Sequence, residues 1–254
     1  MITSNRTLRT LRAGGAESCV WLAMGSAAIA ECAVDAGARS VVLDLQHGLW
    51  DRISLESVIG LVAGSATALV RVRENSPYEI ASALDAGAHG ILVPMIGSAA
   101  EAAAAVAAAH YPPRGCRSAG GVRPLRDMAA YRRLAETEIL TGIMIETVAA
   151  AEDADAIVRI PGIDLVFIGI GDLAISLEAS GRSSLTIQSL IDNVTAAATR
   201  HAVPFGIFTS TAQDARARIA QGFQFVVAEN DISMARNGFA KSLLVASGEP
   251  GVEK

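Results

Sequence analysis

Short, β-branched apolar runs alternate with alanine-rich stretches along almost the whole chain of 254 residues. Eight of these runs have the length of strands, and the segments between them have the length of helices. The expected strands cover residues 19–24, 40–45, 67–72, 90–95, 141–146, 165–170, 204–209 and 223–228. Because strands that are apolar throughout and separated by helices are typical of a parallel sheet, the pattern predicts an α/β fold with helices covering the sheet.

A weak internal repeat supports this interpretation. In AVDAGARSVVLD, ALDAGAHGILVP and RIAQGFQFVVAE, a helix is expected to end, a glycine follows, and a strand begins shortly afterwards. Gly37, Gly87 and Gly222 occupy the position after each helix, where a left-handed backbone favours glycine. Repeated βα units predict a (β/α)8 TIM barrel, with an open doubly wound sheet as the alternative. The sequence has no linker or change of composition, so we expect a single domain over residues 1–254.

Composition excludes several classes of protein. The net charge of −5 argues against nucleic acid or an anionic membrane as the main partner. The three cysteines are widely spaced and form no disulfide framework, which favours a reducing compartment. The chain start lacks the apolar segment of a secretory signal, and the longest apolar stretches are too short to cross a bilayer. We therefore expect a cytoplasmic protein.

Lysine is scarce in this chain. Only Lys241 and Lys254 are present, and both follow the last expected strand. An aldolase that works through an imine needs a lysine that reaches its substrate, ordinarily from a barrel strand. The sequence therefore argues against imine chemistry.

Five polar residues lie where expected strands end. Asp44 lies at the end of one strand, and His47 follows that strand. Arg71 lies near the end of the next strand, Glu146 closes a later one, and Asp172 follows the strand after that. In (β/α)8 barrels, the carboxyl ends of the strands carry the chemistry. The other three histidines lie before strands or at the end of a helix, so His47 is the histidine expected on the active rim.

Glu146 and Asp172 lie one βα unit apart, so their strands are expected to be neighbours. Two carboxylates without a cysteine or a second histidine suit a hard divalent cation such as Mg²⁺ or Mn²⁺. The alternative is two solvated carboxylates at the starts of loops.

The roles of three further residues stay open at this point. His47 has a side chain suited to proton transfer, but it can equally be a metal ligand or an incidental loop residue. Asp85 could orient the His47 imidazole if its helix end approaches, and is otherwise a surface acid near a helix carboxyl terminus. Arg71 interrupts an apolar strand, so it either pairs with a barrel carboxylate or holds an anionic substrate.

One motif points to a different function. Gly169, Gly171 and Ala174 spell GxGxxA after an expected strand, which is a weak dinucleotide fingerprint. Asp172 would lie inside the phosphate turn and repel a pyrophosphate, so we do not expect a nicotinamide cofactor.

Seven ordered motifs now resemble a known family. They are similar to motifs of the HpcH/HpaI aldolases, which are metal-dependent class II pyruvate aldolases. In chain order they read WLAMGS, LDLQHG, VRV followed by SP, LDAGAHGILVPM, YPPRGCR, IMIET and VFIGIGDLAIS. The resemblance runs from about Trp21 to Asp231, nearly the whole chain. It implies a (β/α)8 barrel and a homo-oligomer, commonly a hexamer built as a trimer of dimers, whose C-terminal helix is exchanged between subunits.

The resemblance also assigns catalytic roles to residues of this chain. It implies that Glu146 and Asp172 bind a divalent metal (Mg²⁺, Mn²⁺ or Co²⁺). It implies that His47 is the catalytic base and that Asp85 is its dyad partner.

The remaining roles concern the substrate. The resemblance gives Arg71 both a catalytic and a substrate-binding role, and makes Asp44 the acid that supports the substrate site. The turn at Gly171 and Asp172 would supply backbone N–H groups to the pyruvate carboxylate.

Three departures from the family pattern bear on specificity. Met144 stands where many members have Gln, the common PxDLS reads Ile170 to Ala174, and DGEH reads Asp44 to His47. These changes leave the substrate and the preferred metal undetermined.

The function that follows is retro-aldol cleavage of a 4-hydroxy-2-oxo acid to pyruvate and an aldehyde through a metal-stabilised enolate, with oxaloacetate decarboxylation as a side activity. One alternative is a CoA-ester lyase of the citramalyl or malyl type, for which Arg114, Arg117 and Arg123 form the only basic cluster. The other is a catalytically silent regulatory barrel. Trp50, Asp51 and the loop at 114–126 are candidates for the aldehyde pocket.

Overall fold

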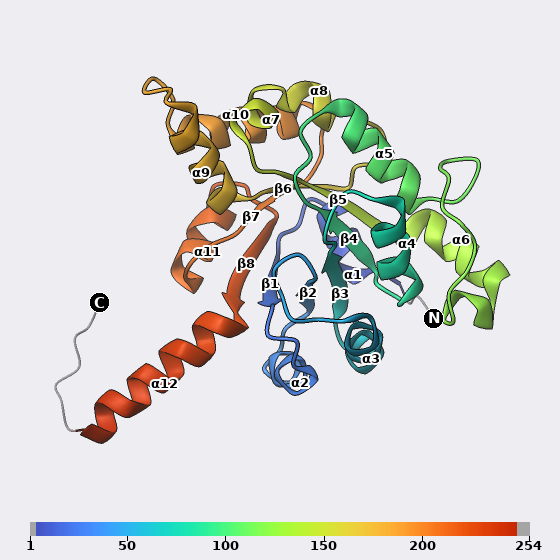
Figure 1. Cartoon of the computed structure of the whole chain (residues 1–254), viewed down its shortest axis with the longest axis horizontal. Helices are drawn as coiled ribbons and strands as arrows, with labels where there is room; N and C mark the ends of the chain where they lie inside the picture. Colours follow the sequence, from blue (N-terminus) through green and yellow to red (C-terminus); the bar gives the residue numbers. More distant parts are fainter. Residues whose placement is uncertain (1–3, 248–254) are drawn as a thin grey trace.

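The computed structural model describes residues 4–247, which form a closed barrel of eight parallel strands in sequence order (Figure 1). The strands are β1 (Glu17–Leu22), β2 (Ser40–Asp44), β3 (Thr67–Arg71), β4 (Gly90–Val93), β5 (Leu140–Ile145), β6 (Leu165–Ile168), β7 (Phe205–Ile207) and β8 (Phe225–Asn230). Each overlaps its expected range. The (β/α)8 barrel is confirmed, and the open doubly wound sheet is wrong.

Helices alternate with the strands of this barrel. They are α1 (Arg6–Arg12), α2 (Ala27–Asp35), α3 (Arg52–Val62), α4 (Pro77–Asp85), α5 (Ala99–Ala109), the 3₁₀ helix η1 (Pro124–Arg126), α6 (Met128–Glu138), α7 (Val148–Glu152), α8 (Ala154–Val158), α9 (Ile170–Ser180), α10 (Ile187–Arg200), α11 (Ala212–Ala220) and α12 (Asp231–Ser247). Gly37, Gly87 and Gly222 have φ values of 100°, 98° and 98°, so the predicted left-handed glycines are confirmed.

Two helices differ from the sequence expectation at positions that matter for the site. The expected strand at 165–170 ends two residues early, and α9 begins at once from Gly169. Helix α1 begins at an Asn5 cap and buries Leu8 and Leu11 in the same apolar cluster as the barrel interior. Helix α1 therefore packs across the amino-terminal end of the barrel interior.

Alternation along the strands separates two apolar clusters. Because successive side chains point to opposite faces, every second residue enters the barrel. The inner cluster includes Val42, Leu69, Met144 and Phe167, which continue the interior face of four strands. Two residues further along β2, β3 and β5, this face reaches the active rim predicted from the sequence.

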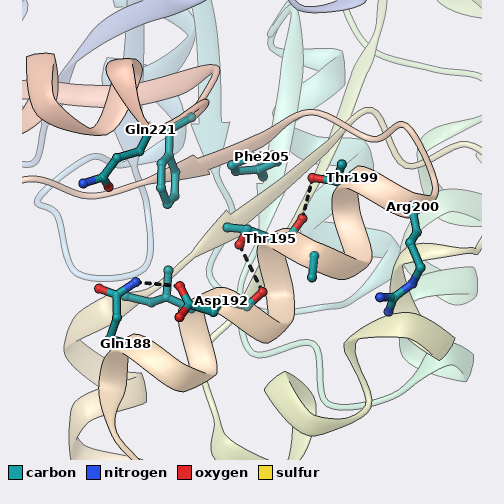
Figure 2. A pocket seen from close by; sticks show the side chains of 10 residues that line it. Gln188, Asp192, Thr195, Thr199, Arg200, Phe205 and Gln221 are labelled. Atoms are coloured by element: carbon teal, nitrogen blue, oxygen red, sulfur yellow. Dashed lines mark hydrogen bonds between the residues drawn. The ribbon is translucent and has the colours of Figure 1, made fainter.

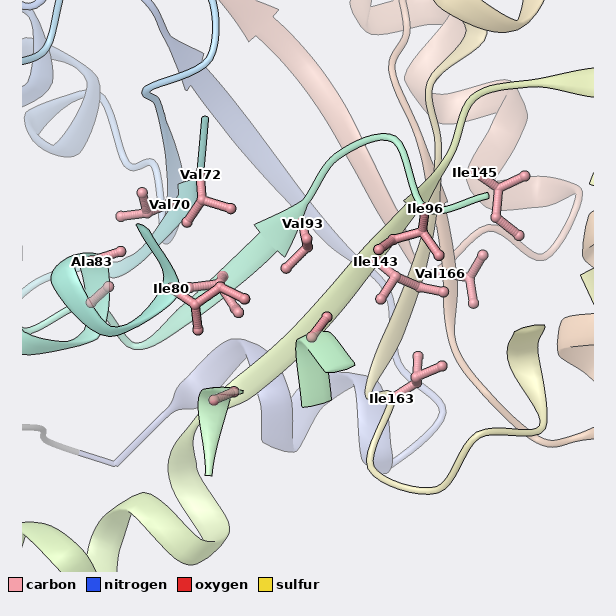
Figure 3. Close-up of a cluster of buried hydrophobic side chains, with 14 of the residues drawn as sticks. Val70, Val72, Ile80, Ala83, Val93, Ile96, Ile143, Ile145, Ile163 and Val166 are labelled. Carbon is pink, nitrogen blue, oxygen red and sulfur yellow. The ribbon is translucent and has the colours of Figure 1, made fainter. Parts of the chain in front are cut away.

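The outer cluster lies between the strands and the helices (Figure 3). Val70 and Val72 of the β3 region lie near Ile80 and Ala83 of α4, while Ile143 projects from β5. All these side chains are buried. The strands are thus apolar on both faces, which explains their continuous apolar sequences.

Helix α12 follows β8 and extends away from the barrel (Figure 1). Asp231, its first residue, accepts hydrogen bonds from the backbone N–H groups of Ala23 and Met24, which ties the helix start to the end of β1. Beyond this point α12 exposes large apolar side chains, namely Ile232, Met234, Phe239, Leu243 and Val245.

Within residues 4–247, no helix is long and apolar enough to cross a membrane. Lys241 lies on α12, outside the strands, and Lys254 lies outside the described residues.

Candidate active site

Polar side chains replace the apolar interior at the carboxyl ends of three strands. Asp44 is the last residue of β2, Arg71 is the last residue of β3, and Glu146 directly follows β5. Each comes two residues after an inward-facing apolar residue, so the period of the strand turns each polar side chain inward. The barrel core therefore ends in a polar layer at this rim.

Asp44 and Arg71 form a buried ion pair. They lie opposite each other in the β2–β3 register. Arg71 donates from Nε to Oδ1 of Asp44 at 2.8 Å and from Nη2 to Oδ2 at 2.5 Å. The side chains are only 11% and 3% exposed. Of the two alternatives for Arg71, pairing with a barrel carboxylate is therefore confirmed, and binding of an anionic substrate stays a prediction.

Further donors surround the Asp44 carboxylate. Trp21 donates from its indole N–H to Oδ2 at 3.3 Å, and the backbone N–H groups of Gln46 and His47 donate to Oδ1. Burial opposes the charged form of Asp44, but the hydrogen bonds and charge of Arg71, aided by Trp21 and His47, outweigh it and lower the pKa of Asp44. With its oxygens occupied in this way, Asp44 supports Arg71 and the His47 loop.

Glu146 has one carboxylate oxygen bound and one without a partner. Its Oε2 accepts from the backbone N–H of Met95 at 2.8 Å, whereas the buried Oε1 has no hydrogen-bond partner. Burial raises the pKa of Glu146, and the negative charge of Asp172 adds to this effect, while the Met95 N–H, Arg71 and His47 oppose it. A buried oxygen without a donor is costly unless something else binds it.

Gly169 allows the next strand to approach this carboxylate. A Cβ at Gly169 would lie 2.3 Å from Oε1 of Glu146, so any side chain here would force the carboxylate to move. Helix α9 begins at the following residue and carries Asp172 in its first turn. The first N–H groups of a helix have no partners inside the helix and favour an anion. Gly171 and Asp172 lie in this first turn, and their role in binding a substrate carboxylate stays a prediction.

These groups surround a cavity of about 250 Å³. It is lined by Trp21, Arg71, Met144, Glu146, Phe167, Gly169, Ile170, Gly171, Asp172 and Phe208. Trp21, Phe167 and Phe208 form an aromatic wall of this cavity that was not predicted from the sequence. The alternation along their strands indicates that these side chains point into the barrel. It does not distinguish a cavity wall from an ordinary barrel core, which also has apolar residues at inward positions.

The donor set fits a hard divalent cation. Glu146 contributes a buried carboxylate oxygen without a hydrogen bond, and Asp172 lines the same cavity. Among residues 4–247 there is no cluster of three or more metal-ligating side chains. Two carboxylates leave several coordination positions for water or a chelating substrate, as is usual for Mg²⁺.

His47 lies at the rim of the site and is exposed. Its backbone N–H donates to Asp44 Oδ1 at 3.3 Å, and its charge acts on Glu146. The imidazole does not line the cavity among the residues that the structure describes. Its role as the base stays a prediction.

Asp85 lies at the other end of the barrel, so its expected contact with His47 is not made within one chain. It is the last residue of α4, which starts near the active rim and runs back by roughly 13 Å. Its Oδ1 accepts from Nη2 of Arg117 at 2.7 Å. Helix direction is the reason: a residue at the end of a barrel helix lies beside the amino-terminal ends of the strands.

The basic cluster lies at the same distant end. Arg117 is buried against Asp85 and Tyr131, Arg114 donates to the Glu136 carbonyl, and Arg123 donates to the carbonyl of Glu56. These arginines fasten the loop at 111–123 to its own subunit, so they do not form an aldehyde or CoA pocket at the rim of this chain.

Two other candidates for the aldehyde pocket have structural roles. Trp50 is buried and donates from its indole N–H to the Leu22 carbonyl at 2.8 Å. Asp51 caps α3 by accepting from the Ser54 N–H. The expectation that these two residues line the aldehyde pocket stays a prediction.

A wider hollow of about 590 Å³ lies on the outer surface, between α10 and the turn after α11 (Figure 2). Gln188 donates to Asp192 at 2.7 Å, while Thr195 and Thr199 donate to backbone carbonyls of α10. Since these polar groups bond within their own helix, the hollow lacks the convergent donors of a catalytic site.

Comparison with known proteins agrees with this geometry. The HpcH/HpaI aldolase/citrate lyase family matches residues 17–237. A hydroxypyruvate/pyruvate aldolase of Rhizorhabdus wittichii is 37% identical over 84% of this chain and 87% of its own length. A 5-keto-4-deoxy-D-glucarate aldolase of Salmonella arizonae is 32% identical over 87% of this chain and 88% of its own.

A solved structure shares the complete fold. A HpcH/HpaI aldolase/citrate lyase family protein from Burkholderia cenocepacia superposes with a TM-score of 0.89 at 26% identity, covering 96% of this chain and 100% of the other. The match in sequence extends over the strands that carry Asp44, Arg71 and Glu146. The chain belongs to the HpcH/HpaI aldolase/citrate lyase family.

Proposed function

We propose that the protein catalyses the reversible aldol cleavage of a 4-hydroxy-2-oxo acid to pyruvate and an aldehyde. The observation that carries this proposal is the cavity in which Arg71, the unpartnered oxygen of Glu146 and the amino terminus of α9 face one another. The relatives named as hydroxypyruvate/pyruvate and 5-keto-4-deoxy-D-glucarate aldolases support the same reaction class.

Glu146 and Asp172 would hold a divalent cation, either Mg²⁺, Mn²⁺ or Co²⁺. When bound, such a cation supplies Lewis acidity toward the oxygens of a 2-oxo acid. Glu146 would bind through Oε1, because its Oε2 is already occupied by the Met95 N–H.

The chain's own residues then orient the substrate. The free N–H groups at Gly171 and Asp172 bind the carboxylate of the 2-oxo acid. Arg71 uses Nε and Nη2 to bind Asp44, which leaves Nη1 to donate to the 2-oxo oxygen. Negative charge grows on this oxygen as the C3–C4 bond breaks, so the guanidinium stabilises the transition state more than the ground state.

His47 moves the proton. In the cleavage direction it takes the proton of the 4-hydroxyl group, the C4–O bond becomes the aldehyde carbonyl, and the electron pair of the C3–C4 bond passes into the enolate of pyruvate. Protonation at C3 then gives pyruvate. The exposure of His47 allows its proton to exchange with water between turnovers. Replacing His47 with Ala should lower kcat far more than it weakens pyruvate binding.

The dyad of His47 with Asp85 requires a second subunit. Asp85 of the same chain lies at the opposite end of the barrel, held by Arg117. Asp85 of another copy would have to approach the rim for the dyad to form, and this arrangement is part of the proposal.

The exposed apolar side chains of α12 support an oligomer. This helix projects away from its own barrel, which agrees with its exchange between subunits (Figure 1). We propose a cytoplasmic homohexamer, arranged as a trimer of dimers.

The experiment that tests the proposed function is an aldehyde panel with pyruvate and Mg²⁺, Mn²⁺ or Co²⁺, read by formation of the 4-hydroxy-2-oxo acid. Product should form with at least one aldehyde, and both chelator and Glu146→Ala should abolish it. If malyl-CoA or citramalyl-CoA is cleaved and no free aldehyde reacts, the protein is a CoA-ester lyase. If neither reaction occurs and pyruvate does not promote metal binding, the barrel is catalytically silent.

A further inference from the structure

Trp21 contacts both members of the buried ion pair. Its indole N–H donates to Oδ2 of Asp44 at 3.3 Å, and the Arg71 Cζ lies 5.0 Å from the centroid of its ring. The face of one side chain thus supports the guanidinium while its edge holds the carboxylate. Trp21 is also part of the cavity wall beside Arg71.

The two supports constrain different motions of Arg71. The paired hydrogen bonds to Asp44 fix the guanidinium within its plane, because both bonds lie along one edge. They do little against tilting of the plane about that edge. The Trp21 ring, whose centroid lies 5.0 Å from the Arg71 Cζ, adds a cation–π contact that holds the guanidinium from a second side. Asp44 and Trp21 together therefore hold the guanidinium and with it the free Nη1.

Trp21 is itself held firmly. Its ring packs against Phe167 and Phe208 with centroid distances of 5.7 Å in both cases, and the residue is 4% exposed. Its backbone lies between Val42 of β2 and Asn230 of β8 in the sheet. A side chain packed on this many sides keeps one rotamer, which is what a support for a binding group requires.

We propose that Trp21 is a positioning residue that aims the free edge of Arg71 at the oxygen of the bound 2-oxo acid or its enolate. This inference rests on the proposed function, since it requires Arg71 to bind that substrate. Trp21 acts through Arg71 and Asp44 and exchanges no proton itself.

The test compares two matched tryptophan substitutions. Trp21→Phe keeps an aromatic ring but removes the N–H and reduces the face under Arg71. Trp50→Phe is the control, because Trp50 is equally buried and its indole N–H also makes one hydrogen bond, but it lies outside the cavity. Both variants lose a similar amount of packing, so a purely structural role predicts similar behaviour.

Two dissociation constants are measured for each variant. One is the Kd of oxalate, a planar mimic of the pyruvate enolate, for the Mn²⁺-loaded protein, and the other is the Kd of Mn²⁺ alone. Trp21→Phe should weaken oxalate about tenfold, the size expected from a misaligned charged hydrogen bond, with the Kd of Mn²⁺ unchanged. Trp50→Phe should leave both constants within about twofold. Equal oxalate constants for the two variants would overturn the proposal.

A double-mutant cycle with Arg71→Lys separates this proposal from the proposed function. If Trp21 acts through Arg71, Trp21→Phe should add no further loss of oxalate affinity in the Arg71→Lys background. A full additional loss would show that Trp21 contacts the ligand independently and would refute the positioning role. If Arg71→Lys itself leaves oxalate binding unchanged, the proposed function fails along with the inference.

Fluorescence supplies a second measurement that needs no change at Trp21. The chain has two tryptophans, so Trp50→Phe leaves Trp21 as the sole one. Oxalate bound at Arg71 changes the charge at the face of the indole, so saturating oxalate should alter the Trp21 emission. Unchanged emission would contradict the inferred coupling.

Discussion

Arg71 and Asp44 lie opposite each other at the ends of β3 and β2 and share two hydrogen bonds of 2.8 and 2.5 Å in a nearly buried position. Removing the charge of Asp44 while retaining Arg71 leaves a buried guanidinium without its counter-ion. Asp44→Asn should therefore lower the free energy of unfolding by about 3–5 kcal/mol. Urea denaturation measures this loss. Asp51→Asn, at an exposed helix cap where Asn serves as well as Asp, should change it by less than about 0.5 kcal/mol and is the control.

The metal-free protein should become more stable when Glu146 is neutralised. Burial raises the pKa of Glu146 above its ordinary value of 4.5, so the folded chain binds this proton more tightly than the unfolded chain does. This contribution to stability is complete below about pH 4.5 and is lost as the pH rises through the folded-state pKa. At neutral pH, Glu146→Gln should add about 0.5–2 kcal/mol in the presence of chelator.

The pH dependence provides the check on this prediction. The stability difference between Glu146→Gln and the wild type should be small near pH 4.5 and increase toward neutral pH. Mn²⁺ should stabilise the wild type and leave Glu146→Gln unchanged. If the stability difference between Glu146→Gln and the wild type decreased with rising pH, the raised pKa of a buried Glu146 carboxylate would be contradicted.

Gly169 should be essential for the metal site. A methyl group at this position would lie 2.3 Å from Oε1 of Glu146, so Gly169→Ala must displace the carboxylate that would bind the cation. We expect at least a tenfold rise in the Kd of Mn²⁺, measured by calorimetry. Gly171→Ala is the control for metal affinity and folding, since a Cβ there meets no atom within 4 Å. Equal Mn²⁺ affinity in the two variants would show that Glu146 does not bind the metal.

Met95 donates its backbone N–H to Glu146, and its own backbone conformation is unfavourable for a non-glycine residue. Its φ is 56°, in the left-handed region, and the residue is 52% exposed. Since Asn tolerates this conformation better, Met95→Asn should stabilise the fold by about 0.5–1 kcal/mol and keep the N–H for Glu146. Met95→Pro, which lacks the N–H and cannot adopt this φ, should lose Mn²⁺ binding. Thermal denaturation and calorimetry check the two results, and a stable, Mn²⁺-binding proline variant would contradict the role of this N–H.

The barrel and most of its rim could be predicted because both depend on periodicity along the chain. Alternation of strands and helices fixes the fold class, and the two-residue period of a strand turns Asp44, Arg71 and Glu146 inward at the ends of their strands. The same argument brought His47 and Asp172 to the same end. No contact between distant residues had to be known for these predictions.

Contacts between residues distant in the sequence could not be predicted, because periodicity does not encode them. Asp85 is near Arg71 in the sequence, but the direction of α4 carries it to the opposite end of the barrel, where Arg117 binds it. Trp50 follows His47 closely, yet its indole N–H is used by the Leu22 carbonyl. In Trp21 the sequence offered only an apolar inward residue, and its role beside Arg71 emerges from the packing of three strands.

The proposed mechanism requires this site to form the enolate of pyruvate without an imine. Exchange of the pyruvate methyl protons with D₂O, followed by ¹H NMR, measures this step directly and requires no knowledge of the aldehyde. We predict exchange with Mg²⁺, Mn²⁺ or Co²⁺, loss of exchange with chelator or in Glu146→Gln and Arg71→Met, and full activity after borohydride treatment in the presence of pyruvate. Exchange that persists in chelator and disappears after borohydride would contradict the account.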